Sequence, residues 1–175
     1  MDQSKEIING FETTLYEFVQ LLSSFSEEQI NTVPFEGSWT GAQVGQHIFK
    51  VIEFMPETLQ GKVKNTDRNP LEKREQIRSV FLDFNTKMKS PDFIEPEIKN
   101  FKKDELIKEF KNKLEQTLEV AKSLDLSKTC MDFEMPVFGH LTRMELIDFA
   151  AVHTQRHMRQ LKKIYEKAKS GKFTH

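Results

Sequence analysis

Two histidines spaced four residues apart interrupt the apolar face of the last helix that the sequence predicts. His153 and His157 stand between Phe149 and Leu161, where the helical pattern calls for core side chains. Residues i and i+4 lie on one face of a helix, about 6 Å apart along its axis, so both imidazoles can reach one ion. The spacing alone is weakly diagnostic, and its place on the apolar face is what predicts an inward-facing site.

A third histidine interrupts the apolar face of an earlier predicted helix, where His47 lies between Val44 and Val51. If the two helices pack together, the three imidazoles meet in the interior. A buried imidazole needs partners for both ring nitrogens, and a bound metal supplies one of them. The alternative is three core histidines, each bonded to a backbone carbonyl or a glutamine. The converging pattern favours a metal site with His47, His153 and His157 as ligands.

Such a ligand set allows the chemistry of an open metal centre. Three neutral nitrogens without a fourth protein ligand leave a position for water or substrate, as in catalytic rather than structural sites. Imidazole ligation suits Zn, Ni, Cu or Fe better than Mg or Ca. Thr154 stands where a zinc protease of the H-E-x-x-H type needs glutamate. The Glu-x-x-His pairs of di-iron bundles are also missing from suitable positions, and no residue is identified as a general base.

Other polar residues are weaker candidates. Gln43 and Gln160 lie one helical turn from the predicted ligands and could orient water or substrate, although bonds to the histidines or a surface position are slightly favoured. Cys130 is expected to be a small buried hydrophobe rather than a nucleophile. His140 is expected to be a loop histidine, and Trp39 a core anchor more than the lining of a pocket.

The elements that must position these residues are four long amphipathic helices. The first carries its apolar residues from Ile7 to Phe25 and ends before Val33-Pro34. The second is capped by Ser38 or Thr40 and runs to about residue 59, with a kink at Pro56. The third spans about 104–124. The fourth begins at a capping box formed by residues 142–145.

The predicted architecture is all-α, and a four-helix bundle is the simplest way to bury four apolar faces. No strand is expected, because the 15 phenylalanines follow helical spacing. Residues 61–103 are the least regular part and form an excursion between the second and third helices, with one short helix from about 71 to 84. The chain is predicted to be one domain over residues 1–170 with a flexible tail at 171–175.

Composition restricts the function classes. The 26 Lys+Arg and 27 Asp+Glu give a net charge of -1, so nothing draws the protein onto nucleic acid. The lysine pairs at 102–103 and 162–163 are interspersed with acidic residues, which predicts a solvent-exposed surface rather than a nucleic-acid-binding face. A single cysteine, Cys130, indicates reducing surroundings. No secretory signal and no apolar run long enough for a membrane span is found, so a cytoplasmic location without a membrane partner is predicted.

Two segments of the chain resemble the signature segments of a known family. One is Trp39-Thr40-x-x-x-Val44-x-x-His47-Ile48. The other combines Gly139-His140-Leu141-Thr142-x-x-Glu145 with His153-x-x-x-His157-x-x-Gln160. They look like those of the DinB/YfiT-like superfamily, and the resemblance covers nearly the whole chain in order and spacing.

The resemblance implies an up-down four-helix bundle, a homodimer, and a divalent metal, most often nickel or zinc, held by His47, His153 and His157. It also implies a metal-dependent transferase or isomerase that uses a low-molecular-weight thiol such as bacillithiol or mycothiol. A thiol on an electron-poor metal loses its proton and can attack an electrophile at neutral pH. A hydrolase would use hydroxide at the same site, and the sequence does not separate the two. The alternative is a non-catalytic interaction or stress-response bundle with a structural or vestigial metal.

Overall fold

The structure, a computed structural model, describes residues 2–171. The predicted tail at 171–175 therefore lies, apart from Gly171, outside the described residues. The helices are α1 (Gln3–Ser23), α2 (Glu27–Asn31), α3 (Gly41–Glu53), α4 (Met55–Gln60), α5 (Arg74–Phe81), α6 (Lys103–Ser123) and α7 (Arg143–Lys169), with a 3-10 turn η1 (Asp92–Ile94). None of these helices is long and apolar enough to cross a membrane.

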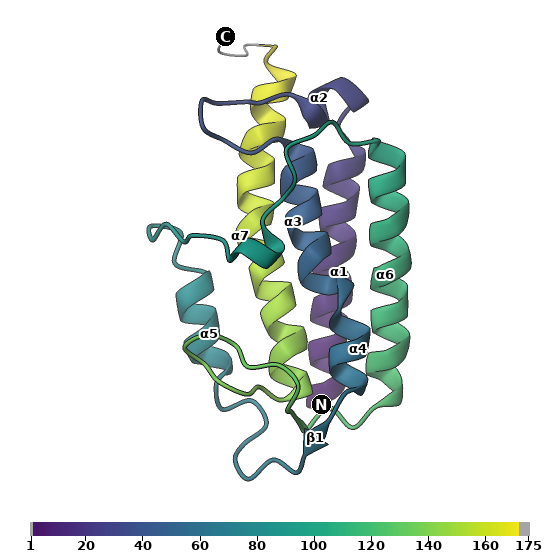
Figure 1. The fold of residues 1–175 in the computed structure, drawn as a ribbon, viewed down its shortest axis with the longest axis vertical. Helices are drawn as coiled ribbons and strands as arrows, with labels where there is room; N and C mark the ends of the chain where they lie inside the picture. The colour runs from purple at the N-terminus through teal and green to yellow at the C-terminus, as the bar shows by residue number, and fades with distance from the viewer. Residues whose placement is uncertain (1, 172–175) are drawn as a thin grey trace.

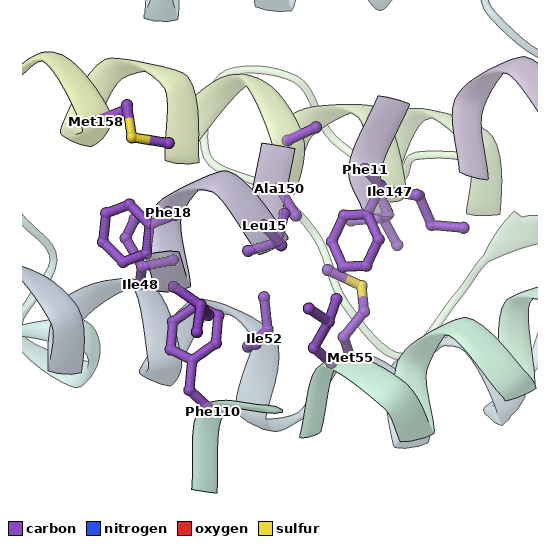
Figure 2. Close-up of a cluster of buried hydrophobic side chains, with 14 of the residues drawn as sticks. Phe11, Leu15, Phe18, Ile48, Ile52, Met55, Phe110, Ile147, Ala150 and Met158 are labelled. Atoms are coloured by element: carbon purple, nitrogen blue, oxygen red, sulfur yellow. The ribbon is translucent and has the colours of Figure 1, made fainter. Parts of the chain in front are cut away.

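Four long helices, α1, α3, α6 and α7, form the bundle (Figure 1). α1 and α3 each pack against both α6 and α7. Their apolar faces meet in one continuous core, which Figure 2 shows around Phe11, Phe18, Ile48, Phe110 and Ile147. The predicted all-α bundle and its excursion between the second and third long helices are thus confirmed.

The helix directions depart from simple alternation. α1 and α7 run one way and α3 and α6 the other, so the consecutive long helices α3 and α6 are parallel (Figure 1). At one end, Lys103 Nζ at the start of α6 donates to the carbonyl of Phe25, just after α1. At the other end, Arg143 Nε at the start of α7 donates to the carbonyl of Leu59 in α4. The physical reason is the excursion, which is long enough to carry the chain back to the end where α3 began.

Local sequence signals account for the helix boundaries. Thr40, rather than Ser38, caps α3, and Thr142 caps α7 as predicted; both form full capping boxes with a residue three positions later. The predicted kink near Pro56 is a break between α3 and α4, where Phe54 leaves helical geometry and Pro56 lies in the first turn of α4. α1 stops ten residues before the predicted limit, because Ser26 begins the separate short helix α2.

The expectation of no strand was wrong in one small region. β1 (Val63–Lys64) and β2 (Thr129–Cys130) pair antiparallel where the loop after α4 meets the loop after α6. Two residues per strand are too few to show a period-two pattern in the sequence. Their pairing satisfies backbone groups of two loops that lie side by side at one end of the bundle.

The excursion contains one helix and one extended crossing. α5 packs along α7, and the chain then crosses in front of α7 to η1 and rises along α3 toward the start of α6 (Figure 1). We call residues 82–97 the strap. The predicted short helix from about 71 to 84 is therefore the eight-residue α5, which begins and ends inside those limits.

Candidate metal centre

The three predicted histidines converge inside the bundle. His47 comes from α3, and His153 and His157 lie one turn apart on α7. The Nε2 atom of His153 is 3.2 Å from Nε2 of His47 and 3.0 Å from Nε2 of His157. One nitrogen from each ring lies within 4.8 Å of the other two. The convergence depends on the contact of α3 with α7, which brings together residues 106 positions apart.

Aromatic side chains surround the three imidazoles. The Trp39 ring lies 5.1 Å from the ring of His47 and 6.4 Å from that of His157, nearly parallel to the latter. His153 is enclosed on another side by Phe81 of α5 and Phe149 of α7, with ring centres 5.5 Å and 5.4 Å away. His47 is only 2% exposed and His153 6%, whereas His157 is partly exposed. Solvent therefore reaches the cluster through His157.

Hydrogen bonds on the far side of two rings fix their tautomers. His47 Nδ1 donates to the carbonyl of Ile94 at 2.8 Å, and His157 Nδ1 donates to Oε1 of Gln160 at 2.8 Å. A neutral imidazole carries one proton, so Nε2 of both rings keeps its lone pair. His153 Nδ1 is buried and has no hydrogen-bond partner among the described residues. Two of the three rings are thus prepared as ligands through Nε2.

Burial lowers the pKa of all three imidazoles. The pKa of His157 falls to about 4, chiefly by desolvation and then by the proximity of His47. Desolvation also holds the pKa of His153 well below its ordinary value, with His157 and His47 adding to the effect. The pKa of His47 is lowered by burial, despite its bond to a carbonyl, and Lys50 adds a smaller effect. At pH 7 all three are neutral, which is the state that binds a metal.

The donor set fits a divalent cation. Nitrogens around a tetrahedral zinc ion, each at about 2.05 Å, lie roughly 3.3 Å from one another. The two Nε2 separations of 3.2 Å and 3.0 Å are close to that value. Within residues 2–171, no carboxylate or thiol joins the three imidazoles in the cluster. The arrangement is therefore a three-nitrogen set with room in its coordination for an exogenous ligand.

The other sequence candidates have structural roles. Gln43 completes the capping box of α3 and donates to the carbonyl of Glu97, while Gln160 orients His157. The bond of Gln160 to His157 is of the kind that the sequence slightly favoured over a substrate contact, whereas the capping role of Gln43 was not predicted. Cys130 is buried, which raises its pKa to about 11, so its thiol is inert at neutral pH. His140 is a loop residue whose Nδ1 donates to a backbone carbonyl.

Sequence reasoning missed the residues that attach the strap to the two helices that carry the clustered histidines. Gln46 and Lys50 of α3 and Arg156 of α7 all bond to strap backbone. Gln46 and Arg156 are direct sequence neighbours of His47 and His157, and that adjacency was the available signal. Their partners are peptide groups, however, and a peptide group carries no sequence pattern that could be matched to them.

A second buried polar cluster lies nearer the start of α7. Both carboxylate oxygens of Glu145 accept hydrogen bonds, from the guanidinium of Arg68 at 2.7 Å and from the backbone amides of Lys73 and Thr142. One turn later Asp148 accepts from Arg78 and pairs with Arg74 of α5. These contacts fix the excursion and α5 to α7, and they leave the Glu145 carboxylate without a free oxygen.

The comparisons with known proteins agree with this architecture. The family model of the DinB superfamily matches residues 11–161. The uncharacterized protein YuaE of Bacillus subtilis (strain 168) is 31% identical over 150 residues, which cover 83% of this chain and 89% of that protein. No solved structure gave a significant match. Because the family model spans most of the bundle and all three histidines, the chain belongs to the DinB superfamily.

Proposed function

We propose that this protein is a metal-dependent enzyme in which His47, His153 and His157 hold a zinc or nickel ion. Its reaction is the transfer of a low-molecular-weight thiol to an electrophile, or hydrolysis at the same centre. The observation that carries the proposal is the convergence of three neutral imidazoles, which no fourth ligand from residues 2–171 joins. Open three-nitrogen sites are typical of catalytic rather than structural metal centres.

The chain's own residues suit an anionic reactant. A bound divalent cation would supply Lewis-acid chemistry, lowering the pKa of a coordinated thiol or water. The three imidazoles are neutral and so leave the charge of such a cation uncompensated. Lys50 and Arg156 add positive potential at the cluster, where they help to lower the pKa values of the histidines. A thiolate or hydroxide is the ligand that this field favours.

The aromatic residues have a separate role in the proposed reaction. Trp39, Phe81 and Phe149 line the cluster and exclude water from the sides of the rings. A drier site strengthens the attraction between the cation and an anionic ligand. The partly exposed side of His157 is then the route by which a small thiol reaches the centre.

One observation favours a second candidate, a non-catalytic bundle with a stabilising metal. Two of the surface hollows lie away from the cluster, one between α2 and the segment before α6 and the other at loop 134–139. An enzyme needs room for its substrate beside the metal, whereas a structural site needs none. The two readings differ in whether an added thiol reaches the bound ion.

The test is elemental analysis of metal bound to untagged protein, after incubation with Zn²⁺ or Ni²⁺ and gel filtration. We expect about one ion per chain in the wild type and none in His47→Ala or His153→Ala, with helical circular dichroism retained. His140→Ala is the matched control, because this histidine is bonded to a loop carbonyl outside the cluster. Absence of metal from the wild type would rule out the proposed mechanism.

A second measurement separates the two candidates once metal is bound. A low-molecular-weight thiol is titrated into the Ni²⁺-loaded protein while the near-ultraviolet absorption is followed. A new sulfur-to-metal charge-transfer band supports the thiol transferase reading. An unchanged spectrum, with tightly bound metal, rules out thiol transfer and leaves hydrolysis at the centre or the non-catalytic bundle.

A further inference from the structure

The strap is attached to both ligand-bearing helices by residues next to the ligands. On the α7 side the attachment is Arg156, which precedes His157 in the chain. Its guanidinium donates to the backbone carbonyls of Phe81 at 3.2 Å, Asp83 at 2.8 Å and Thr86 at 2.5 Å. The Arg156 side chain thus bonds to three backbone positions between the end of α5 and Thr86.

On the α3 side the attachment includes a ligand itself. Gln46 Oε1 accepts from the amide of Glu97 at 2.7 Å, and Lys50 Nζ donates to the carbonyl of Glu95 at 2.7 Å. Between them, His47 Nδ1 donates to the carbonyl of Ile94. The strap therefore supplies the acceptor that selects the tautomer of His47 and fixes the plane of its ring.

The middle of the strap also contacts α7 through the Arg159 guanidinium, which lies 4.6 Å from the centre of the Phe84 ring, and is otherwise mostly open to solvent. Residues 84–89 are all exposed, and so are Pro91, Asp92 and Phe93. Only Ile94 and Pro96 are buried, beside α3. α5 is anchored independently by its buried Ile77 and by the pairing of Arg78 with Asp148. Release of the strap would therefore leave the bundle core and α5 in place.

We propose that the docked strap supports the metal centre, and that Arg156 is a positioning residue that acts on His47 through the strap. This inference rests on the proposed metal-binding function. Without Arg156 the chain between α5 and Ile94 gains conformational freedom, the Ile94 carbonyl leaves His47 Nδ1 for part of the time, and the ring is no longer held for Nε2 ligation. Coupling is reciprocal, so bound metal must also stabilise the docked strap.

The direction of the effect separates positioning from simple electrostatics. Arg156 is a positive charge beside the cluster, so its removal alone should tighten the binding of a cation. Loss of ring orientation should instead weaken binding, about tenfold by analogy with other residues that orient metal-binding histidines. A weaker affinity in Arg156→Gln is thus opposite in sign to the charge effect.

The experiment compares full-length wild type, Arg156→Gln and the control Lys163→Gln. The control removes one positive charge from an exposed position of α7 outside the strap contacts. Ni²⁺ affinity is measured by titration calorimetry at pH 7, and the ligand field by the visible spectrum of the Co²⁺-loaded protein. We expect Arg156→Gln to bind Ni²⁺ about tenfold more weakly with an altered Co²⁺ spectrum, and Lys163→Gln to match the wild type in both.

Limited trypsin digestion measures how often the strap is undocked, because Lys87 and Lys89 are exposed within it and trypsin cleaves after lysine. Ni²⁺ should slow cleavage there in the wild type, and Arg156→Gln should be cut faster even with Ni²⁺ present. If Arg156→Gln fails to fold, Gln46→Met takes its place in the comparison. This variant removes the side-chain oxygen that accepts from the Glu97 amide at the α3 end of the strap.

The outcomes separate this inference from the proposed function. Unchanged or tighter Ni²⁺ binding by a folded Arg156→Gln protein whose strap is cut faster would overturn the inference and leave the metal centre standing. Failure of the wild type to bind Ni²⁺, Zn²⁺ or Co²⁺ would overturn both.

Discussion

α7 carries two buried polar clusters that differ in how their polar atoms are satisfied. Near its start, both oxygens of Glu145 accept hydrogen bonds from a guanidinium and from backbone amides. Two to three turns later, Nε2 of His153 faces Nε2 of His47 and Nε2 of His157. The other ring nitrogen of His153, Nδ1, has no partner in the part of the chain described.

The difference separates a structural role from a binding role. A buried charge that is fully paired and hydrogen-bonded needs nothing from outside the protein. Three clustered imidazoles, two of which present a lone pair at Nε2 to the third, are incomplete without a cation between them, and natural cores rarely keep such an arrangement unless it is used. Removing polar groups should therefore destabilise the protein at the first cluster and stabilise the metal-free protein at the second.

The largest effect is expected at the satisfied cluster. Glu145→Ala leaves the guanidinium of Arg68 without its carboxylate and opens the capping box of α7, so we expect a loss of about 3–5 kcal/mol in the free energy of unfolding. Urea denaturation measures it, with Glu166→Ala on the exposed face of α7 as control. Ni²⁺ binding at saturating metal should remain at one ion per folded chain; its loss would mean that the two clusters are not independent.

An intermediate effect is expected from acid on the metal-free protein. Burial lowers the pKa of His157 to about 4, whereas the unfolded chain protonates it near pH 6.5. Protons therefore bind preferentially to the unfolded state between these values, and stability falls as the pH drops from about 6.5 to about 4. For His157 alone the loss from pH 7 to pH 5 is about 2 kcal/mol.

Urea midpoints at pH 7 and pH 5 test this dependence. His157→Phe should show a shallower loss than the wild type over the same interval, because its remaining clustered histidines are His47 and His153 only. Identical losses in the two proteins would show that the acid sensitivity arises elsewhere.

The smallest and most diagnostic effect concerns His153. Its ring is enclosed by Phe81 and Phe149, and its Nδ1 has no hydrogen-bond partner within residues 2–171. His153→Leu replaces this polar ring with an apolar side chain, so we expect the metal-free protein to gain about 1 kcal/mol while metal binding is lost. Thermal unfolding with chelator and elemental analysis give the two readings. A destabilised variant would indicate that His153 is a structural core residue.

Helical periodicity explains how much of the fold could be predicted. The four long helices, the capping box at Thr142 and the break at Pro56 all depend on residues within a few positions of one another. The parallel course of α3 and α6 depends on where the excursion returns the chain, and the β1–β2 pair joins loops more than sixty residues apart. Neither property leaves a local pattern.

The same limit applies to the site. His47, His153 and His157 were predictable because each interrupts an apolar helical face, which is a local signal. The acceptor for His47 is the carbonyl of Ile94, and every residue has a carbonyl, so the chemical type of Ile94 gives no indication of this role. The role of Arg156 likewise appears only from its hydrogen bonds to three backbone oxygens, all of which lie outside α7.

The pairing of the first helix with the last has a consequence for synthesis on the ribosome. α1 packs against α7, and α7 also brings two of the three histidines. A nascent chain that has reached only residue 142 holds His47 alone, and the face of α1 that α7 will cover is still open. Domains complete their folding once their last packing element has been synthesised. The histidine cluster therefore forms only after translation has passed α7, and a chain terminated before α7 offers a metal only one imidazole of this cluster.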